Sequence, residues 1–178
     1  MNYFEFYQLP ESFLPDEKEI KNKYYALSRE YHPDFHANAS PEKQSEILAL
    51  STLNTNAYRT LSNPDARMHY ILSQHGLLEE GKNNELPQDF LMEMMELNEQ
   101  IMELEFDFDQ DNFEKVSQET IGLGASLEND IRPTLQQFPM LEGFTRDEAL
   151  QQIKTYYLKK KYLLRIQESL TKFASQSS

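Results

Sequence analysis

The spacing of apolar residues predicts helices rather than strands, because apolar positions recur every three or four residues and seldom alternate. The first such segment is residues 16–31. One face of it carries Ile20, Tyr24, Leu27 and Tyr31. Pro15 favours a helix start there, and Pro33 favours an end near residue 31, because the residue before a proline is disfavoured in the α conformation. We therefore expect an α-helix over residues 16–31.

Two further helices are expected before residue 75. Ser40 is a good cap residue and Pro41 suits the first helical position, so a helix should begin there. Its apolar face includes Ile47, Leu50, either Leu53 or Asn54, Ala57 and Leu61. A shorter helix should begin at Asn63-Pro64 and run through Leu72. The first two helices then form an antiparallel hairpin.

Residues 76–86 are polar, contain two glycines and precede Pro87, which is typical of a linker. Three helices are expected after it. The first is residues 87–106; the second begins at the capping box Asp111-Asn-Phe-Glu114, and Pro133 ends or kinks it; the third begins at the capping box Thr145-Arg-Asp-Glu148 and runs over 145–173. The inner stripe of the last one is Ala149, Ile153, Tyr156, Leu163, Leu170 and Phe173. Such helices with short connections pack as a three-helix bundle, so the fold class is all-α.

Composition excludes several classes of function. The 178 residues include 17 Lys and Arg against 30 Asp and Glu, so no nucleic-acid footprint is expected. The absence of cysteine excludes disulfides, thiol nucleophiles and Cys-ligated metals, and no apolar run is long enough for a membrane span. We expect no cofactor and no membrane partner. With no basic or Arg-rich leader at the N-terminus, the chain is expected in a reducing compartment, the bacterial cytoplasm.

The segment 87–106 carries apolar residues beyond those that a bundle core needs. Its core stripe is Phe90, Met94, Leu97, Ile101 and Leu104. A second apolar set lies on adjacent turns: Leu91, Met92, Met95 and Met102. Glu93, Glu96, Glu99 and Glu103 surround it. Methionine is frequent at binding surfaces, but a wide buried face explains the pattern equally well, so both interpretations stay open.

The turn His32-Pro33-Asp34 lies between the two hairpin helices and offers three exposed groups. A metal site of His32, Asp34 and His36 is one alternative, and an ordinary interhelical turn is another. A second acidic pattern, Asp107-x-Asp109-x-Asp111, has calcium-loop spacing but lacks the glycine and the final glutamate, so a capped turn is the better interpretation. No nucleophile–base pair is visible, and we do not expect an enzyme.

The turn and its flanking helices resemble a J-domain, the module that stimulates ATP hydrolysis by DnaK-type chaperones. The resemblance rests on His32-Pro33-Asp34, on the helix ending Asn54-Thr-Asn-Ala-Tyr-Arg-Thr-Leu61, and on Pro64-Asp-Ala-Arg67. It implies that these three turn residues contact the ATPase of a DnaK/HscA-type chaperone. The expected docking residues on the preceding helix are Lys18, Lys21, Lys23, Tyr25 and Arg29. Phe35 departs from the family, where lysine commonly follows the aspartate.

A J-domain followed by an acidic bundle opening with Phe90-Leu-Met-Glu is similar to the HscB family, co-chaperones of iron–sulfur cluster assembly. The resemblance implies a J-domain over 1–75, a linker over 76–86 and a bundle over 87–178 that binds an IscU-type scaffold protein. The implied scaffold contacts are Leu91, Met92, Met95, Glu96, Glu99, Glu103 and an aromatic of the last helix. That aromatic is Tyr157, which we expect to be exposed because it lies outside the inner stripe, and its neighbour Tyr156 is the alternative. The alternative is a J-domain protein with a different client.

Overall fold

The computed structural model describes residues 1–79 and 84–176. The predicted linker over 76–86 therefore lies partly outside the described residues. The described ranges contain helices and no strand, which confirms the all-α fold. The chain divides into two compact units. One comprises Met1–Gly76 with Phe138–Met140, and the other comprises Leu77–Gln137 with Leu141–Ser178.

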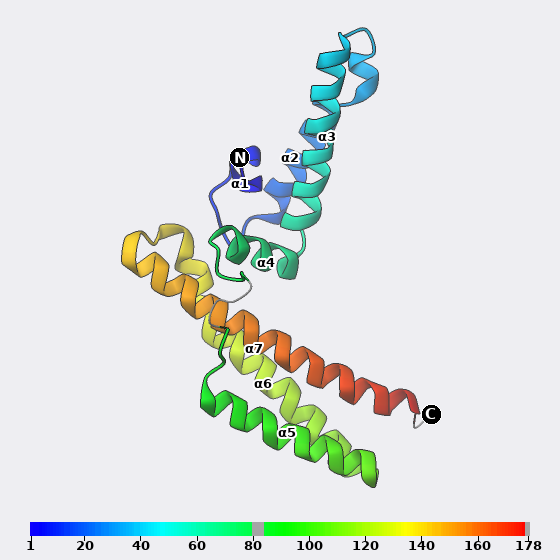
Figure 1. Cartoon of the computed structure of the whole chain (residues 1–178), viewed down its shortest axis with the longest axis vertical. Coiled ribbons are helices and arrows are strands. Elements are labelled where there is room, and N and C mark those ends of the chain that lie inside the picture. Colours follow the sequence, from blue (N-terminus) through cyan, green and yellow to red (C-terminus); the bar gives the residue numbers. More distant parts are fainter. Residues whose placement is uncertain (80–83, 177–178) are drawn as a thin grey trace. The chain divides into compact units, whose positions relative to one another are not determined.

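The N-terminal unit is built around a helical hairpin (Figure 1). Its elements are α1 Tyr3–Tyr7, α2 Glu17–Glu30, η1 Pro33–His36, α3 Pro41–Leu61 and α4 Pro64–Gln74. α2 and α3 lie side by side, and η1 lies in their connection. Side-chain caps set the starts of these helices: Asp16 accepts from the Lys18 amide at 2.8 Å, and Ser40 from Lys43 at 3.3 Å. The predicted start of α3 at Pro41 is thus confirmed.

A buried polar residue, Asn54, ties three helices of this unit together. The sequence left the choice between Leu53 and Asn54 open, and the structure buries Asn54 to 1% exposure. Its amide donates to the Tyr24 carbonyl and to Ser28 Oγ, both at 3.0 Å. Its Oδ1 accepts from the Tyr7 hydroxyl at 2.9 Å. Every polar group of this side chain is therefore paired, so its burial leaves no polar atom without a hydrogen-bond partner.

Arg67 is a second buried polar residue of the N-terminal unit. It is buried, and its guanidinium donates from Nη1 to the Leu61 carbonyl at 2.6 Å and from Nε to the Phe13 carbonyl at 3.0 Å. Burial lowers the pKa of Arg67 below its ordinary value. The side chain therefore links the end of α3 to the segment before α2.

The C-terminal unit is a three-helix bundle made of α5 Gln88–Phe106, α6 Gln110–Gln137 and α7 Gly143–Gln176. The short η2 Phe138–Met140 between α6 and α7 belongs to the other unit. The predicted core stripe of α5 is confirmed. Its members pack with residues of α6 and α7 in one cluster: Phe90, Met94, Leu97, Ile101, Leu104, Val116, Leu163, Ile166 and Leu170.

The start of α6 differs from the prediction. The capping residue is Asp109, whose carboxylate accepts from the Asp111 amide at 2.9 Å, and not Asp111 itself. Of the two predicted effects of Pro133, the structure excludes the end of the helix, because α6 continues through Pro133 to Gln137. A proline removes one helical hydrogen bond, and the buried Leu135 beyond it packs well enough for the helix to continue.

The start of α7 also differs. The helix begins at Gly143, two residues before the predicted cap. Thr145 Oγ1 donates to the Glu142 carbonyl at 2.8 Å instead of accepting from an amide. Most of the predicted inner stripe of α7 is buried, with Phe173 half-buried at its end.

Candidate functional site

The tip of the hairpin presents the His32-Pro33-Asp34 turn to solvent. His32 precedes η1, and its Nδ1 accepts from the Asp34 amide at 3.3 Å, while its carbonyl accepts from the Phe35 amide at 3.1 Å. Pro33 occupies the first position of η1, where its fixed φ suits the turn. The Asp34 side chain is 86% exposed. The turn is therefore locally ordered, and its carboxylate is open to a partner.

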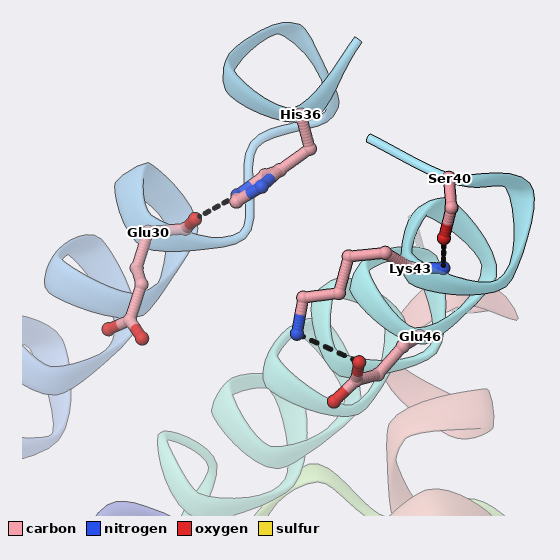
Figure 2. A network of polar contacts seen from close by, with 5 residues as sticks. All are labelled: Glu30, His36, Ser40, Lys43 and Glu46. Atoms are coloured by element: carbon pink, nitrogen blue, oxygen red, sulfur yellow. Dashed lines mark hydrogen bonds and ion pairs between the residues drawn. The ribbon is translucent and has the colours of Figure 1, made fainter. Parts of the chain in front are cut away.

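His36 connects this turn to the end of α2 (Figure 2). Its Nε2 lies 2.8 Å from the Glu30 carbonyl oxygen. A carbonyl only accepts, so Nε2 carries the proton in this contact. On the α3 side, Gln44 Nε2 donates to the carbonyls of Ala37 and Ala39 at 3.0 and 3.1 Å. Both ends of the connection are thus held, and the turn has a defined geometry.

The metal alternative finds no support in this geometry. His36 uses Nε2 for the Glu30 carbonyl, and His32 uses Nδ1 within its own turn. Among residues 1–79 and 84–176, no three His, Cys, Asp or Glu side chains are grouped so that they could hold a metal ion. The second acidic pattern contains the cap of α6, because Asp109 accepts from the Asp111 amide. Both patterns are therefore accounted for by turn and cap contacts.

The outer face of α2 presents the predicted docking residues. Lys18, Lys21, Tyr25 and Arg29 are exposed, and Lys23 is half-buried. The opposite face buries Ile20 and half-buries Tyr24, whose ring stacks on Tyr58 of α3 at 4.2 Å between centroids. One face of α2 is therefore held in the unit, and the other is free to approach an acidic surface. That it does so stays a prediction.

The second apolar set lies on the outer face of α5, and the structure shows that it is exposed. Leu91, Met92 and Met95 are all exposed, although the core stripe of the same helix is buried. Glu96, Glu99 and Glu103 are exposed beside them. α5 is thus apolar on two faces, of which only one is covered within its bundle. Exposed apolar area with a charged border is the anatomy of a protein interface.

The expectation that Tyr157 is exposed is wrong. Its side chain is only 9% exposed, and Tyr156 beside it is buried to a similar degree. The first half of α7 buries two adjacent stripes, since Leu150 and Lys154 are buried as well as the inner positions. A residue next to the inner stripe is therefore buried too. Lys161 Nζ lies 5.3 Å from the centre of the Tyr157 ring, a cation–π contact.

The sequence does not predict the structural roles of three residues: His36, Asn54 and Phe106. The sequence indicates His36 only as a candidate metal ligand, and Asn54 only as one of two core candidates and as part of the helix ending that resembles a J-domain. Phe106 was assigned no role, although it is the next residue after Met102 at helical spacing. Extending the i, i+3, i+4 pattern to the end of the helix would have found it.

Two family models match the chain, and together they span nearly all of it. Residues 2–70 match the DnaJ domain, and residues 86–171 match the HSCB C-terminal oligomerisation domain. The chain belongs to the HscB family. Within residues 1–79 and 84–176, no helix has the length and apolarity that a bilayer crossing needs.

Curated HscB proteins are 28–35% identical to this chain over the residues that align. Co-chaperone protein HscB of Proteus mirabilis is 31% identical over 113 residues, which is 63% of this chain and 65% of that protein. The HscB homolog of Neisseria meningitidis Z2491 is 28% identical over 158 residues, 85% of this chain and 89% of that protein. The human iron–sulfur cluster co-chaperone HscB is 35% identical over 105 residues, 58% of this chain and 45% of that protein.

The match therefore spans somewhat less than two thirds of the Proteus relative's length.

Solved HscB structures have the same fold. Vibrio cholerae HscB has a TM-score of 0.63 with full coverage of both chains, at 24% identity. Human HscB has a TM-score of 0.68, covering 98% of this chain and 82% of that one, also at 24% identity. The HscB arrangement of a J-domain and a C-terminal bundle is thus the fold of this chain.

Proposed function

We propose that this HscB-family chain is a co-chaperone that delivers an IscU-type iron–sulfur scaffold protein to a DnaK/HscA-type chaperone and stimulates the chaperone's ATPase. The observation that carries the proposal is that the chain presents two exposed surfaces of unlike chemistry in separate units. The N-terminal unit offers an ordered His-Pro-Asp turn beside a basic helix face. The C-terminal unit offers an apolar face bordered by carboxylates.

The chaperone contact is assigned to His32, Pro33 and Asp34. An exposed carboxylate at a fixed turn can accept a bidentate pair of hydrogen bonds from an arginine of the ATPase domain. Lys18, Lys21, Lys23, Tyr25 and Arg29 add a docking face. Because these charges are exposed, they speed the encounter more than they tighten the complex, and the encounter weakens as salt rises.

The scaffold contact is assigned to the outer face of α5. Leu91, Met92 and Met95 supply apolar area, worth about 25 cal/mol per Å² removed from water before the costs of association. Glu96, Glu99 and Glu103 orient basic groups of the scaffold around it. The name of the human relative, an iron–sulfur cluster co-chaperone, supports this choice of client. Tyr157 is buried and is not proposed as a direct contact.

The test is a calorimetric titration of the chain with the iron–sulfur scaffold protein of the same organism. Wild type should bind in the micromolar range, and Met92→Ser/Met95→Ser should lose binding. The control is Ile121→Ser/Leu164→Ser, which removes two exposed apolar side chains of α6 and α7. It should bind like wild type.

The chaperone's steady-state ATPase rate, measured with the same proteins, tests the other surface. Stimulation without any scaffold binding would leave a J-domain protein with a different client, and the proposal would fail. Equal loss of binding in both double mutants would also contradict the assignment to α5.

A further inference from the structure

The exposed apolar face of α5 continues beyond the residues assigned above. Met102 is 65% exposed and Phe106 is 96% exposed. They follow Met95 by seven and eleven residues, which places all three on one face of the helix. Met92 to Phe106 spans about 21 Å of helix at 1.5 Å per residue. The apolar face therefore runs nearly the whole length of α5.

Phe106 differs from the aromatic two residues after it. Phe108 packs against the rings of Phe113 and Phe173, with centroids 5.7 and 6.3 Å away. It belongs to the end of the bundle. Phe106 is instead almost wholly in water, in the last turn of an ordered helix. Leaving so large an apolar side chain in water forgoes the stabilisation that burial gives, so its exposure indicates a surface for a partner.

Met102 and Phe106 border an open groove of about 660 Å³ at this end of α5. Its other walls are Glu99, Glu103, Asp107, Asp109 and Asn112. The groove thus combines two exposed apolar side chains with four carboxyl groups.

The charge around the groove selects the occupant. Residues 84–114 contain eleven Asp and Glu and no Lys or Arg. An acidic segment would be repelled from such a surface, whereas a cationic one is attracted and its register fixed. The apolar side chains require that the occupant also carry an apolar group.

We propose that Met102, Phe106 and this groove form a distal subsite that binds a second segment of the scaffold, one with an apolar side chain flanked by Lys or Arg. The inference rests on the proposed function and extends it, because it adds residues and a partner chemistry to the same helix face. Met92 and Met95 form the proximal part of the interface, and Met102 and Phe106 the distal part.

The first test uses the methionines as reporters. The chain has seven, so a sample with ¹³C-labelled methionine methyl groups gives few signals. On titration with the scaffold protein, the methyl signals of Met92, Met95 and Met102 should all shift or broaden. Met140 is also exposed but belongs to the other unit, and it should not respond.

The outcomes separate the two proposals. Response of Met92 and Met95 without Met102 would overturn the distal subsite and leave the proposed function standing. No response at any of the three would overturn both.

The second test examines the charge of the occupant. Met102 is exposed, so its substitution should leave the fold intact, which circular dichroism and the melting temperature check. Met102→Ser/Phe106→Ser should weaken scaffold affinity about tenfold. Met102→Lys should weaken it more than Met102→Glu, because an added cation repels a cationic segment. The reverse order, or unchanged affinity in the Ser variant, would overturn the proposal.

Discussion

The hairpin tip and the outer face of α5 expose their side chains by opposite means. At the tip, three residues stand on a turn held by contacts of His32 and His36 with nearby backbone. On α5, the exposed residues stand on one helix whose opposite face is the core of the bundle. The exposure of the tip residues depends on the backbone conformation of the turn. The exposure of the outer residues of α5 requires only that the helix is formed.

This difference predicts how each surface responds to mutation. Exposed side chains of α5 can change without moving the backbone, because the core stripe holds the helix in place. The tip can lose function through residues that touch no partner, because they set the geometry of the turn. The same contrast separates the two proposed partners, since each unit carries one of the two surfaces.

The largest expected effect is at Asp34. Asp34→Asn removes the charge that we propose pairs with an arginine of the chaperone, so stimulation of its ATPase should be lost while scaffold affinity stays unchanged. Asp130→Asn on α6 makes the same charge change at another exposed position and should stimulate like wild type. Steady-state ATP hydrolysis measures both. Full stimulation by Asp34→Asn would remove the assigned role of the turn.

The two faces of α5 should differ in stability. Leu97→Ala empties part of the bundle core and should cost about 2–5 kcal/mol in the free energy of unfolding. Met95→Ala on the exposed face should change it by about 0.5 kcal/mol or less. Urea denaturation of the two variants makes the comparison. A large loss in Met95→Ala would show that this face is covered in solution.

Loss of the buried hydrogen bonds of Asn54 should destabilise the N-terminal unit. Asn54→Ala removes three side-chain hydrogen bonds and leaves a small cavity, so we expect a loss of about 2–3 kcal/mol. Scaffold binding by the other unit should persist. Thermal melting followed by scaffold titration measures both, and a matching loss of scaffold affinity would contradict the separation of the two surfaces.

The smallest effect is expected at His36. His36→Ala removes the contact with the Glu30 carbonyl and should cost about 1 kcal/mol or less, because the site is largely exposed. ATPase stimulation should fall several-fold, since the turn loses a constraint, and should not vanish. His75→Ala, which removes a histidine paired with Glu11 in the same unit, is the matched control. Equal effects of the two variants on stimulation would show that His36 has no special role.

Local signals in the sequence predicted most of the fold. Ser40-Pro41 and Asn63-Pro64 mark helix starts through contacts within three residues, so those boundaries were confirmed. The core stripe of α5 was also confirmed, because apolar spacing alone determines which residues share a face. The capping boxes at Asp111 and Thr145 were wrong because their spacing also occurs inside a helix that starts earlier.

The amino-acid sequence by itself determined the helices, their apolar faces and the family motif, since each depends on neighbours a few residues away. Only the tertiary structure decided which residues are covered. It buried Tyr157 and Asn54 and left Met95 and Phe106 in water. Burial depends on which surfaces of distant segments meet, and the pattern along one helix shows that a face is apolar without showing what packs against it.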